Sequence, residues 1–217
     1  MVTTKLLKKS LSGRRREIRE KLSEFRSVIR RGNDGELFEE LAFCIFTAGA
    51  SARMGIKSVE AVRPVMMTAK SANQFSRLII KNGAHRFPNA RARYLLHTRN
   101  YIARAHGMEM KRLILSFKDP ARRRAFFAEN RDIKGIGFKE ASHFLRNIGI
   151  SGYAILDKHI MNCLFELKIV DDPSPPANGK MYVEIENKLK RYAKRNGFDI
   201  DEIDLLLWSE KTGVILK

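Results

Sequence analysis

The sequence predicts an all-α fold, and three observations support this prediction. Apolar residues recur at helical spacing along most of the 217 residues, and no stretch of any length alternates as a half-buried strand does. Glycine and proline fall between the periodic segments, where helices begin and end. The hydrophobic content of 44% is enough to bury a sizeable core, in one large domain or in two small lobes that share a cleft.

The N-terminal half contains a series of predicted amphipathic helices. Residues 14–30 carry apolar side chains at helical spacing, with arginine and glutamate between them. Asn33 followed by Glu36 resembles a capping box, so the next helix is expected to begin there and to end at the small residues 48–50. The same periodicity predicts further helices over residues 56–69, 72–81, 88–106, 108–116 and 120–129.

The C-terminal part is also predicted to be helical. Residues 171–179 form the one proline-rich loop of the chain, which need not be a linker between domains. Gly197 and Gly213 are expected to end the last two helices. The helices predicted in this part cover residues 154–169, 180–195 and 201–211.

The charge of the chain points to a polyanionic partner. Lys and Arg number 42 against 24 Asp and Glu, which gives a formal charge of +18 and a pI near 10.2. This balance favours nucleic acid over its alternatives, an anionic membrane surface or a merely well-solvated basic protein.

Cysteine usage and hydropathy suggest a location in the cell. Cys44 and Cys163 each lie in an apolar run, where a buried thiol is the ordinary state, and two cysteines are too few for a disulfide framework. No apolar run approaches the roughly 20 residues that span a bilayer, and the N-terminus lacks the apolar core of a signal peptide. We therefore expect a cytoplasmic protein.

A glycine pair in the middle of the chain indicates an anion site. Gly135 and Gly137 flank one apolar residue just before the helix that holds Phe144, so free backbone N–H groups are expected to point outward at that helix start. Glycine permits the unusual φ angles of a tight turn and the close approach of a ligand. The segment is therefore predicted to be a helix-hairpin-helix element that binds a DNA phosphate.

Lys139 is the candidate nucleophile. It lies in the first turn of the helix after the hairpin, near the positive end of the macrodipole and among basic residues, and both destabilise its ammonium form. A neutral lysine amine attacks carbonyl-like carbons to form a Schiff base, and deoxyribose C1′ is the nearest such carbon beside a bound DNA phosphate. The alternative is a surface lysine that pairs with phosphate.

Asp157 is the candidate for charge stabilisation or proton transfer. It follows the apolar residues 153–156, so its carboxylate is expected at the edge of a core, only partly solvated. An aspartate at this place also fits a helix N-cap, and the two roles are compatible. His159 is a candidate phosphate donor, or else a packed or capping residue.

Residues 135–139, with Asp157 and His159 downstream, resemble the helix-hairpin-helix DNA glycosylase superfamily, and the rest of the chain resembles its archaeal-type 8-oxoguanine DNA glycosylase/AP lyase branch. The resemblance extends from about residue 15 to Lys217. It implies that Lys139 is the Schiff-base nucleophile and that Asp157 assists loss of the base. Lys134 stands where relatives often have proline, which adds a candidate phosphate contact. Supporting stretches are residues 38–47, 86–94 and 206–217.

The resemblance also implies two helical subdomains with an active-site cleft between them. We expect a central subdomain over residues 34–150, which ends in the helix-hairpin-helix at about 122–150. The second subdomain is expected to combine residues 1–33 with residues 151–217. The hairpin then lies at the end of one subdomain, and Asp157 lies at the start of the other.

Recognition of the base requires an acceptor and flat surfaces. 8-Oxoguanine carries N7–H and O8, which guanine lacks, and a flipped base must be held between side chains. Trp208 and Phe87 are candidates for the two surfaces, Phe87 because of the resemblance, although core packing is the alternative for both. The resemblance implies that the C-terminal tail folds back and places Lys217 at the base pocket. The apolar residues 214–216 favour such a docked tail over a frayed end.

Together these predictions describe a bifunctional enzyme that excises 8-oxoguanine from duplex DNA and then nicks the abasic site by β-elimination. The alternatives are a glycosylase for another damaged base and a non-catalytic helix-hairpin-helix module that binds DNA. No cofactor and no metal are expected, since two cysteines cannot supply the four-cysteine iron–sulfur signature of endonuclease III-like relatives. We expect a nucleoid-associated monomer with DNA as its partner and no membrane contact.

Overall fold

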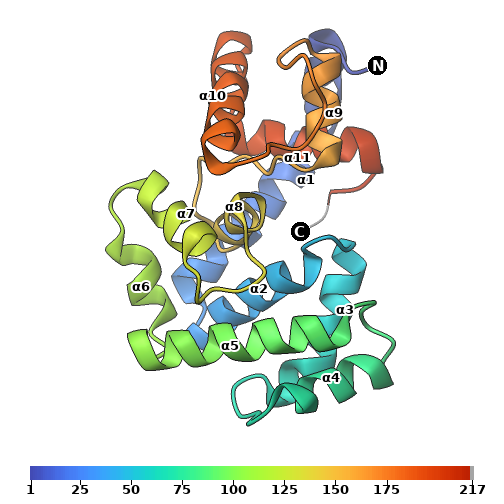
Figure 1. Cartoon of the computed structure of the whole chain (residues 1–217). Coiled ribbons are helices and arrows are strands. Elements are labelled where there is room, and N and C mark those ends of the chain that lie inside the picture. Colours follow the sequence, from blue (N-terminus) through green and yellow to red (C-terminus); the bar gives the residue numbers. More distant parts are fainter. Residues whose placement is uncertain (216–217) are drawn as a thin grey trace. The chain divides into compact units, whose positions relative to one another are not determined.

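The computed structural model describes residues 1–215, and these residues form helices and connecting loops without any strand (Figure 1). The all-α prediction is confirmed. The elements are α1 (Thr4–Arg31), α2 (Asp34–Thr47), α3 (Ala52–Val62), the 3-10 turn η1 (Arg63–Val65), α4 (Ala72–Lys81), α5 (Pro88–His106), α6 (Met110–Ser116), α7 (Pro120–Glu129), α8 (Phe138–Asn147), α9 (Lys158–Glu166), α10 (Gly179–Asn196) and α11 (Ile200–Thr212).

Most predicted helices are present at the expected places. Helices α4, α5 and α7 have the predicted boundaries. The predicted capping box of α2 is confirmed, because Asn33 Oδ1 accepts the Glu36 N–H at 3.0 Å and Glu36 Oε2 accepts the Asn33 N–H at 2.8 Å. Helix α1 begins ten residues before the predicted start, since buried Leu7 and Leu11 continue its apolar stripe.

Two further predicted helices differ from the structure, and the first of them begins at Ala52 rather than at residue 56. The helix predicted over residues 56–69 ends at Val62, and the 3-10 turn that follows contains Pro64, which has no N–H for a helical hydrogen bond. The helix predicted over residues 154–169 begins only at Lys158. Residues 154–157 have no regular secondary structure instead, because side chains from later helices bind the N–H groups of residues 154–156.

The chain divides into two compact units. Unit 1 combines Met1–Ser27 with Leu145–Lys217, and unit 2 is Val28–Phe144. Helices α1 and α8 each continue from one unit into the other. None of the described helices combines the length and the apolar content that a membrane span needs.

Helix α2 forms the centre of unit 2. Every one of residues 37–47 is buried except Glu39, and α2 contacts α3, α5 and α6. Helix α4 packs along α5, as Figure 1 shows in green and cyan. Phe127 of α7 meets Phe144 of α8 with ring centroids 5.0 Å apart, which joins the two helices of the hairpin element.

Helix α11 forms the centre of unit 1. Residues 203–207 are all buried, and α11 contacts α9 and α10. The N-terminal part of α1 is attached to the same unit by polar contacts at two of its turns. Thr4 Oγ1 lies 2.8 Å from the Tyr192 hydroxyl, and Arg19 Nε lies 2.7 Å from Glu202 Oε1.

Candidate active site and DNA-binding hairpin

The helix-hairpin-helix element consists of α7, the turn at residues 130–137, and α8, and its residues up to Phe144 belong to unit 2. Helix α5 holds the turn in place. Asn130 Nδ2 donates to the Tyr101 hydroxyl at 2.8 Å, and the Lys134 N–H donates to Thr98 Oγ1 at 2.9 Å. The turn is therefore fixed before any ligand binds.

Gly135 is the turn residue that only glycine can supply. Its φ of +76° lies in the left-handed region. A Cβ at this position would lie 2.8 Å from Tyr94 Cδ2 and 3.2 Å from Arg91 Nη1. Gly137 differs from the prediction: it is not among the residues with positive φ, and a Cβ there would make an ordinary 3.4 Å contact with Glu140 Oε2. Steric demand within the protein therefore explains Gly135 but not Gly137.

The backbone donors of the hairpin are fewer than the sequence predicts. The Lys134 N–H is bound to Thr98, and the Gly137 N–H donates to Glu140 Oε2 at 3.2 Å. Within residues 1–215 the N–H groups of Gly135 and Ile136 have no hydrogen-bond partner. The turn thus presents these two donors to an anion.

Lys139 is the second residue of α8, so its predicted place in the first turn is confirmed. Its side chain is 31% exposed, and its Nζ lies 2.9 Å from Glu140 Oε1. The surroundings are therefore not only basic, as the sequence predicts, because the Glu140 carboxylate forms an ion pair with Lys139. Glu140 is 13% exposed and binds the hairpin with one oxygen and Lys139 with the other.

Sequence reasoning missed Glu140, although a signal was present. A glycine followed three residues later by glutamate has the spacing of a capping box, in which the glutamate reaches back to the N-cap N–H. The Gly137–Glu140 bond is that contact. The same carboxylate acts on Arg91 of α5. Burial lowers the pKa of Arg91, and the charge of Glu140 partly opposes this shift.

Asp157 lies in unit 1 and is the N-cap of α9, which confirms the structural role that the sequence allows. Its Oδ1 accepts the N–H groups of His159 and Ile160, both at 2.8 Å. The side chain is half-buried, as predicted from the apolar residues before it. Its Oδ2 makes no hydrogen bond with any described residue, so one carboxylate oxygen remains available for chemistry.

The predicted recognition residues lie at different places. Trp208 is half-buried on α11, and His159 is half-buried in the first turn of α9, both in unit 1. Phe87, in unit 2, is 51% exposed at the N-cap of α5, with the Arg86 guanidinium 4.9 Å from its ring centroid. Lys217 lies outside the described residues; before it, Ile215 is buried and Val214 is exposed.

Unit 2 therefore brings most of the predicted DNA-binding residues together with the candidate nucleophile. Lys134, Gly135, Gly137 and Lys139 all belong to one turn and the helix that follows it. Helix α5, which begins beside Phe87, supplies the contacts that hold this turn.

Neither cysteine is a candidate nucleophile. Cys44 and Cys163 are buried free thiols, and burial raises the pKa of Cys163 to about 12. Among the residues that the structure describes, no group of His, Cys, Asp and Glu side chains has a geometry that could hold a metal ion.

Comparison with known families identifies the chain. The model of the family described as 8-oxoguanine DNA glycosylase matches residues 18–198. The chain belongs to this family. The resemblance to 8-oxoguanine DNA glycosylases, expected from the hairpin, from Asp157 and from the rest of the chain, is thereby confirmed.

Relatives match over most of their own length. The 8-oxoguanine DNA glycosylase/AP lyase of Methanocaldococcus jannaschii is 36% identical over 200 residues, which cover 92% of this chain and 91% of that protein. The protein of the same description from Korarchaeum cryptofilum is 36% identical over 202 residues, which cover 93% and 91%.

Solved structures show the same fold. The Methanocaldococcus jannaschii 8-oxoguanine glycosylase/lyase in complex with a 15mer DNA containing 8-oxoguanine has a TM-score of 0.86 at 32% identity, with 98% of this chain and 99% of that chain covered. The 8-oxoguanine DNA glycosylase of Thermotoga maritima also has a TM-score of 0.86, at 29% identity, with 99% and 98% covered.

Proposed function

We propose that this protein excises 8-oxoguanine from duplex DNA and then cuts the strand at the resulting abasic site. The observation that carries the proposal is Lys139, whose half-buried amine lies in the first turn of the hairpin helix in a member of the 8-oxoguanine DNA glycosylase family. The two unpartnered N–H groups of Gly135 and Ile136 lie a few residues before it, where they can bind a backbone phosphate.

Lys139 is the proposed nucleophile. Its Nζ forms a bond to C1′ while the N9–C1′ bond breaks, and the base leaves with the bonding electron pair. Opening of the sugar ring then gives a Schiff base, from which β-elimination removes a C2′ proton, breaks the C3′–O3′ bond and releases the 3′ strand with its phosphate. Water then hydrolyses the Schiff base and returns the Lys139 amine. The amine must lose protons along this path, and Glu140 Oε1, at 2.9 Å, is the nearest carboxylate that can accept one.

Asp157 is proposed to stabilise the positive charge that develops on the sugar as the base departs. Its Oδ1 is committed to the cap of α9, so Oδ2 is the atom that we assign to this role. Trp208 and Phe87 are proposed to hold the flipped base, and Lys217 to read it. Lys134 and His159 are proposed to contact phosphates.

The substrate also suggests where and how the enzyme works. We propose that it acts as a monomer in the cytoplasm, on the DNA of the nucleoid. The formal charge of +18 supports association with DNA that carries no lesion.

Borohydride trapping tests the proposal directly. Lys139→Gln should abolish covalent trapping to a duplex that contains 8-oxoguanine, because Gln has no amine, and should leave the Kd for that duplex largely unchanged. Lys134→Gln is the matched control on the same hairpin; it should weaken binding but still be trapped. Persistent trapping of Lys139→Gln would refute the assignment.

A panel of duplexes, each with one lesion, separates the alternatives. The proposed function requires that the 8-oxoguanine duplex be trapped and cut fastest. Faster cleavage of a duplex with an oxidised pyrimidine or an alkylated purine would assign another base to this enzyme. Binding without cleavage of any lesion would indicate a non-catalytic DNA-binding module.

A further inference from the structure

The segment that leads to Asp157 has no regular secondary structure, although it is buried. Residues 153–156 are all buried, and they form neither a helix nor a strand with any described residue. Buried backbone N–H groups require hydrogen-bond partners, which regular structure ordinarily supplies. In this segment the partners are side chains of two later helices.

Helix α10 supplies two of these partners. The Ala154 N–H donates to Glu186 Oε1 at 2.9 Å, and the Leu156 N–H donates to the Tyr182 hydroxyl at 3.0 Å. The same hydroxyl donates to the Ala154 carbonyl at 2.7 Å. Tyr182 thus bonds to the two residues on either side of Ile155, and its bond to Leu156 is made one residue before Asp157.

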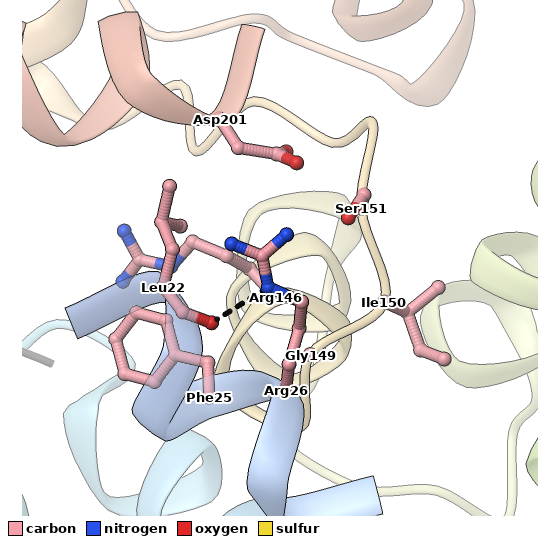
Figure 2. A pocket seen from close by; sticks show the side chains of 8 residues that line it. All are labelled: Leu22, Phe25, Arg26, Arg146, Gly149, Ile150, Ser151 and Asp201. Carbon is pink, nitrogen blue, oxygen red and sulfur yellow. Dashed lines mark hydrogen bonds between the residues drawn. The ribbon is translucent and has the colours of Figure 1, made fainter. Parts of the chain in front are cut away.

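Helix α11 supplies one partner within the segment and one just before it. The Gly152 N–H donates to Asp201 Oδ1 at 2.9 Å, and the Ile155 N–H donates to Asp204 Oδ1 at 2.9 Å. Arg146 Nη1 lies 3.3 Å from the other oxygen of Asp204. Figure 2 shows Arg146 and Asp201 lining one pocket, with the Asp201 carboxylate directed toward Ser151.

This arrangement is costly for a structural connection. Glu186 and Asp204 are 2% and 1% exposed, and a buried carboxylate loses its hydration. The loss is large enough to raise the pKa of Asp204 to about 7, even though Arg146 acts in the opposite direction. A loop that only joined α8 to α9 would not require such buried acidic groups.

We propose that Tyr182, Glu186 and Asp204 are positioning residues for Asp157. They fix three successive peptide N–H groups directly before it, and so fix the place from which its Oδ2 acts on the sugar. The inference rests on the proposed function, because Asp157 matters only if the protein excises a base. It extends that function to three side chains that bind the backbone directly before Asp157.

Tyr182→Phe is the most specific test, because it removes one hydroxyl and keeps the ring. Tyr192→Phe is the matched control: Tyr192 is buried on the same helix, and its hydroxyl bonds to Thr4 rather than to the segment before Asp157. Each variant loses one buried phenol hydroxyl, so a similar fall in Tm is expected for both. The difference between them should appear in catalysis.

Two reactions are compared for each variant. The first is single-turnover excision from a duplex with 8-oxoguanine, which requires Asp157. The second is β-elimination on a duplex with a preformed abasic site, which requires Lys139 but no loss of a base. We expect Tyr182→Phe to slow excision at least tenfold and to leave abasic-site cleavage and Kd within twofold of wild type. Tyr192→Phe should leave all three unchanged.

A conservative pair at Glu186 gives a second readout. Glu186→Gln keeps an oxygen that can accept the Ala154 N–H, so it should retain most of the excision rate. Glu186→Ala removes the acceptor and should slow excision as Tyr182→Phe does.

Three outcomes would overturn the inference. They are excision by Tyr182→Phe within twofold of wild type, an equal loss in both reactions, and an equal loss in Tyr192→Phe. Failure of the proposed function can be distinguished from failure of this inference. In that case the wild-type protein itself would not excise 8-oxoguanine, whether or not it cuts the abasic duplex.

Discussion

The two carboxylate oxygens of Asp157 have different surroundings. Oδ1 caps α9 through two N–H groups, and Oδ2 makes no hydrogen bond with a described residue. Asparagine is as good an N-cap as aspartate, but it carries no charge. One substitution can therefore remove the proposed chemistry and keep the structure.

We predict that Asp157→Asn slows excision of 8-oxoguanine by about 100-fold or more, since a charge that faces the transition state is lost. Its free energy of unfolding should stay within about 0.5 kcal/mol of wild type, because the cap survives. Single-turnover excision and urea denaturation measure the two effects. A fully active variant would remove Asp157 from the mechanism, and an unstable one would mean that Asn does not replace the cap.

Residue-scale prediction from sequence depends on whether the relevant partners are near in the chain. The first-turn position of Lys139 and the N-cap position of Asp157 follow from local spacing, and the structure confirms both positions. The bond of Glu140 to the Gly137 N–H could have been predicted in the same way, because the two residues have the spacing of a capping box. Asp204 was not, because its partners Ile155 and Arg146 lie far away in the sequence, and a lone aspartate in an apolar run does not name its partner.

The hairpin offers a prediction at the scale of an element. Gly135→Ala places a Cβ 2.8 Å from Tyr94 Cδ2 at a φ of +76°. The left-handed conformation alone costs an L-residue about 1–2 kcal/mol, so we predict a loss of at least that much stability in urea denaturation. The turn should also shift, which weakens duplex binding.

Gly137→Ala is the control for this prediction, because it has neither a positive φ nor a close contact. Its stability should stay within about 0.5 kcal/mol of wild type. Weaker DNA binding in this variant would then report a close approach of phosphate to the backbone. Equal stability of Gly135→Ala and wild type would contradict the steric account of the turn.

Elements defined by local signals were predicted well, and one defined by distant side chains was not. Prolines at the starts of α5 and α7 and glycine at the end of α5 mark boundaries that the sequence shows directly. Residues 154–157 have no regular secondary structure, although they contain apolar residues typical of a helix start. Glu186, Tyr182 and Asp204 accept the N–H groups of residues 154–156, which a helix would otherwise use. No residue near position 154 in the sequence indicates these distant partners.

At the scale of the whole molecule, the stability should depend on pH through Asp204. Burial raises its pKa from the ordinary value of 3.8 to about 7. The folded state therefore keeps a proton that the unfolded chain releases above about pH 4, so this contribution to stability is complete below that pH and is lost as pH rises to about 7.

We predict that Asp204→Asn gains stability relative to wild type as pH rises from about 4 to about 7, by at most about 1.4 kcal/mol per pH unit. Urea denaturation of both proteins across this range measures the difference. A difference that does not change with pH would show that Asp204 titrates normally in the folded protein.

The net charge of +18 gives a second whole-molecule prediction. Duplex binding should weaken at least about tenfold between roughly 50 and 200 mM salt, which corresponds to two or more neutralised phosphates. Duplexes with and without the lesion should show similar slopes in titrations, because the salt-dependent contacts are to the backbone. Binding that is independent of salt would contradict a phosphate-dominated interface.

The fold class and the family were accessible from the sequence at this scale, since helical periodicity and the hairpin residues extend over most of the chain. The division into Met1–Ser27 with Leu145–Lys217 and Val28–Phe144 depends on packing inside α1 and α8, which show no break where the units meet. Continuous helices give no boundary signal in composition.

The side-chain bonds to residues 152–156 also have a consequence for divergence among relatives. Backbone N–H groups are the same in every residue except proline, so the bonds to Glu186, Asp204 and Tyr182 do not depend on which apolar side chains the segment carries. An exchange of one apolar side chain for another of similar volume at residues 154–156 should therefore keep these bonds, whereas loss of an acceptor at any of the three distant residues should break one. Side chains of α10 and α11 thus determine the backbone conformation of this segment.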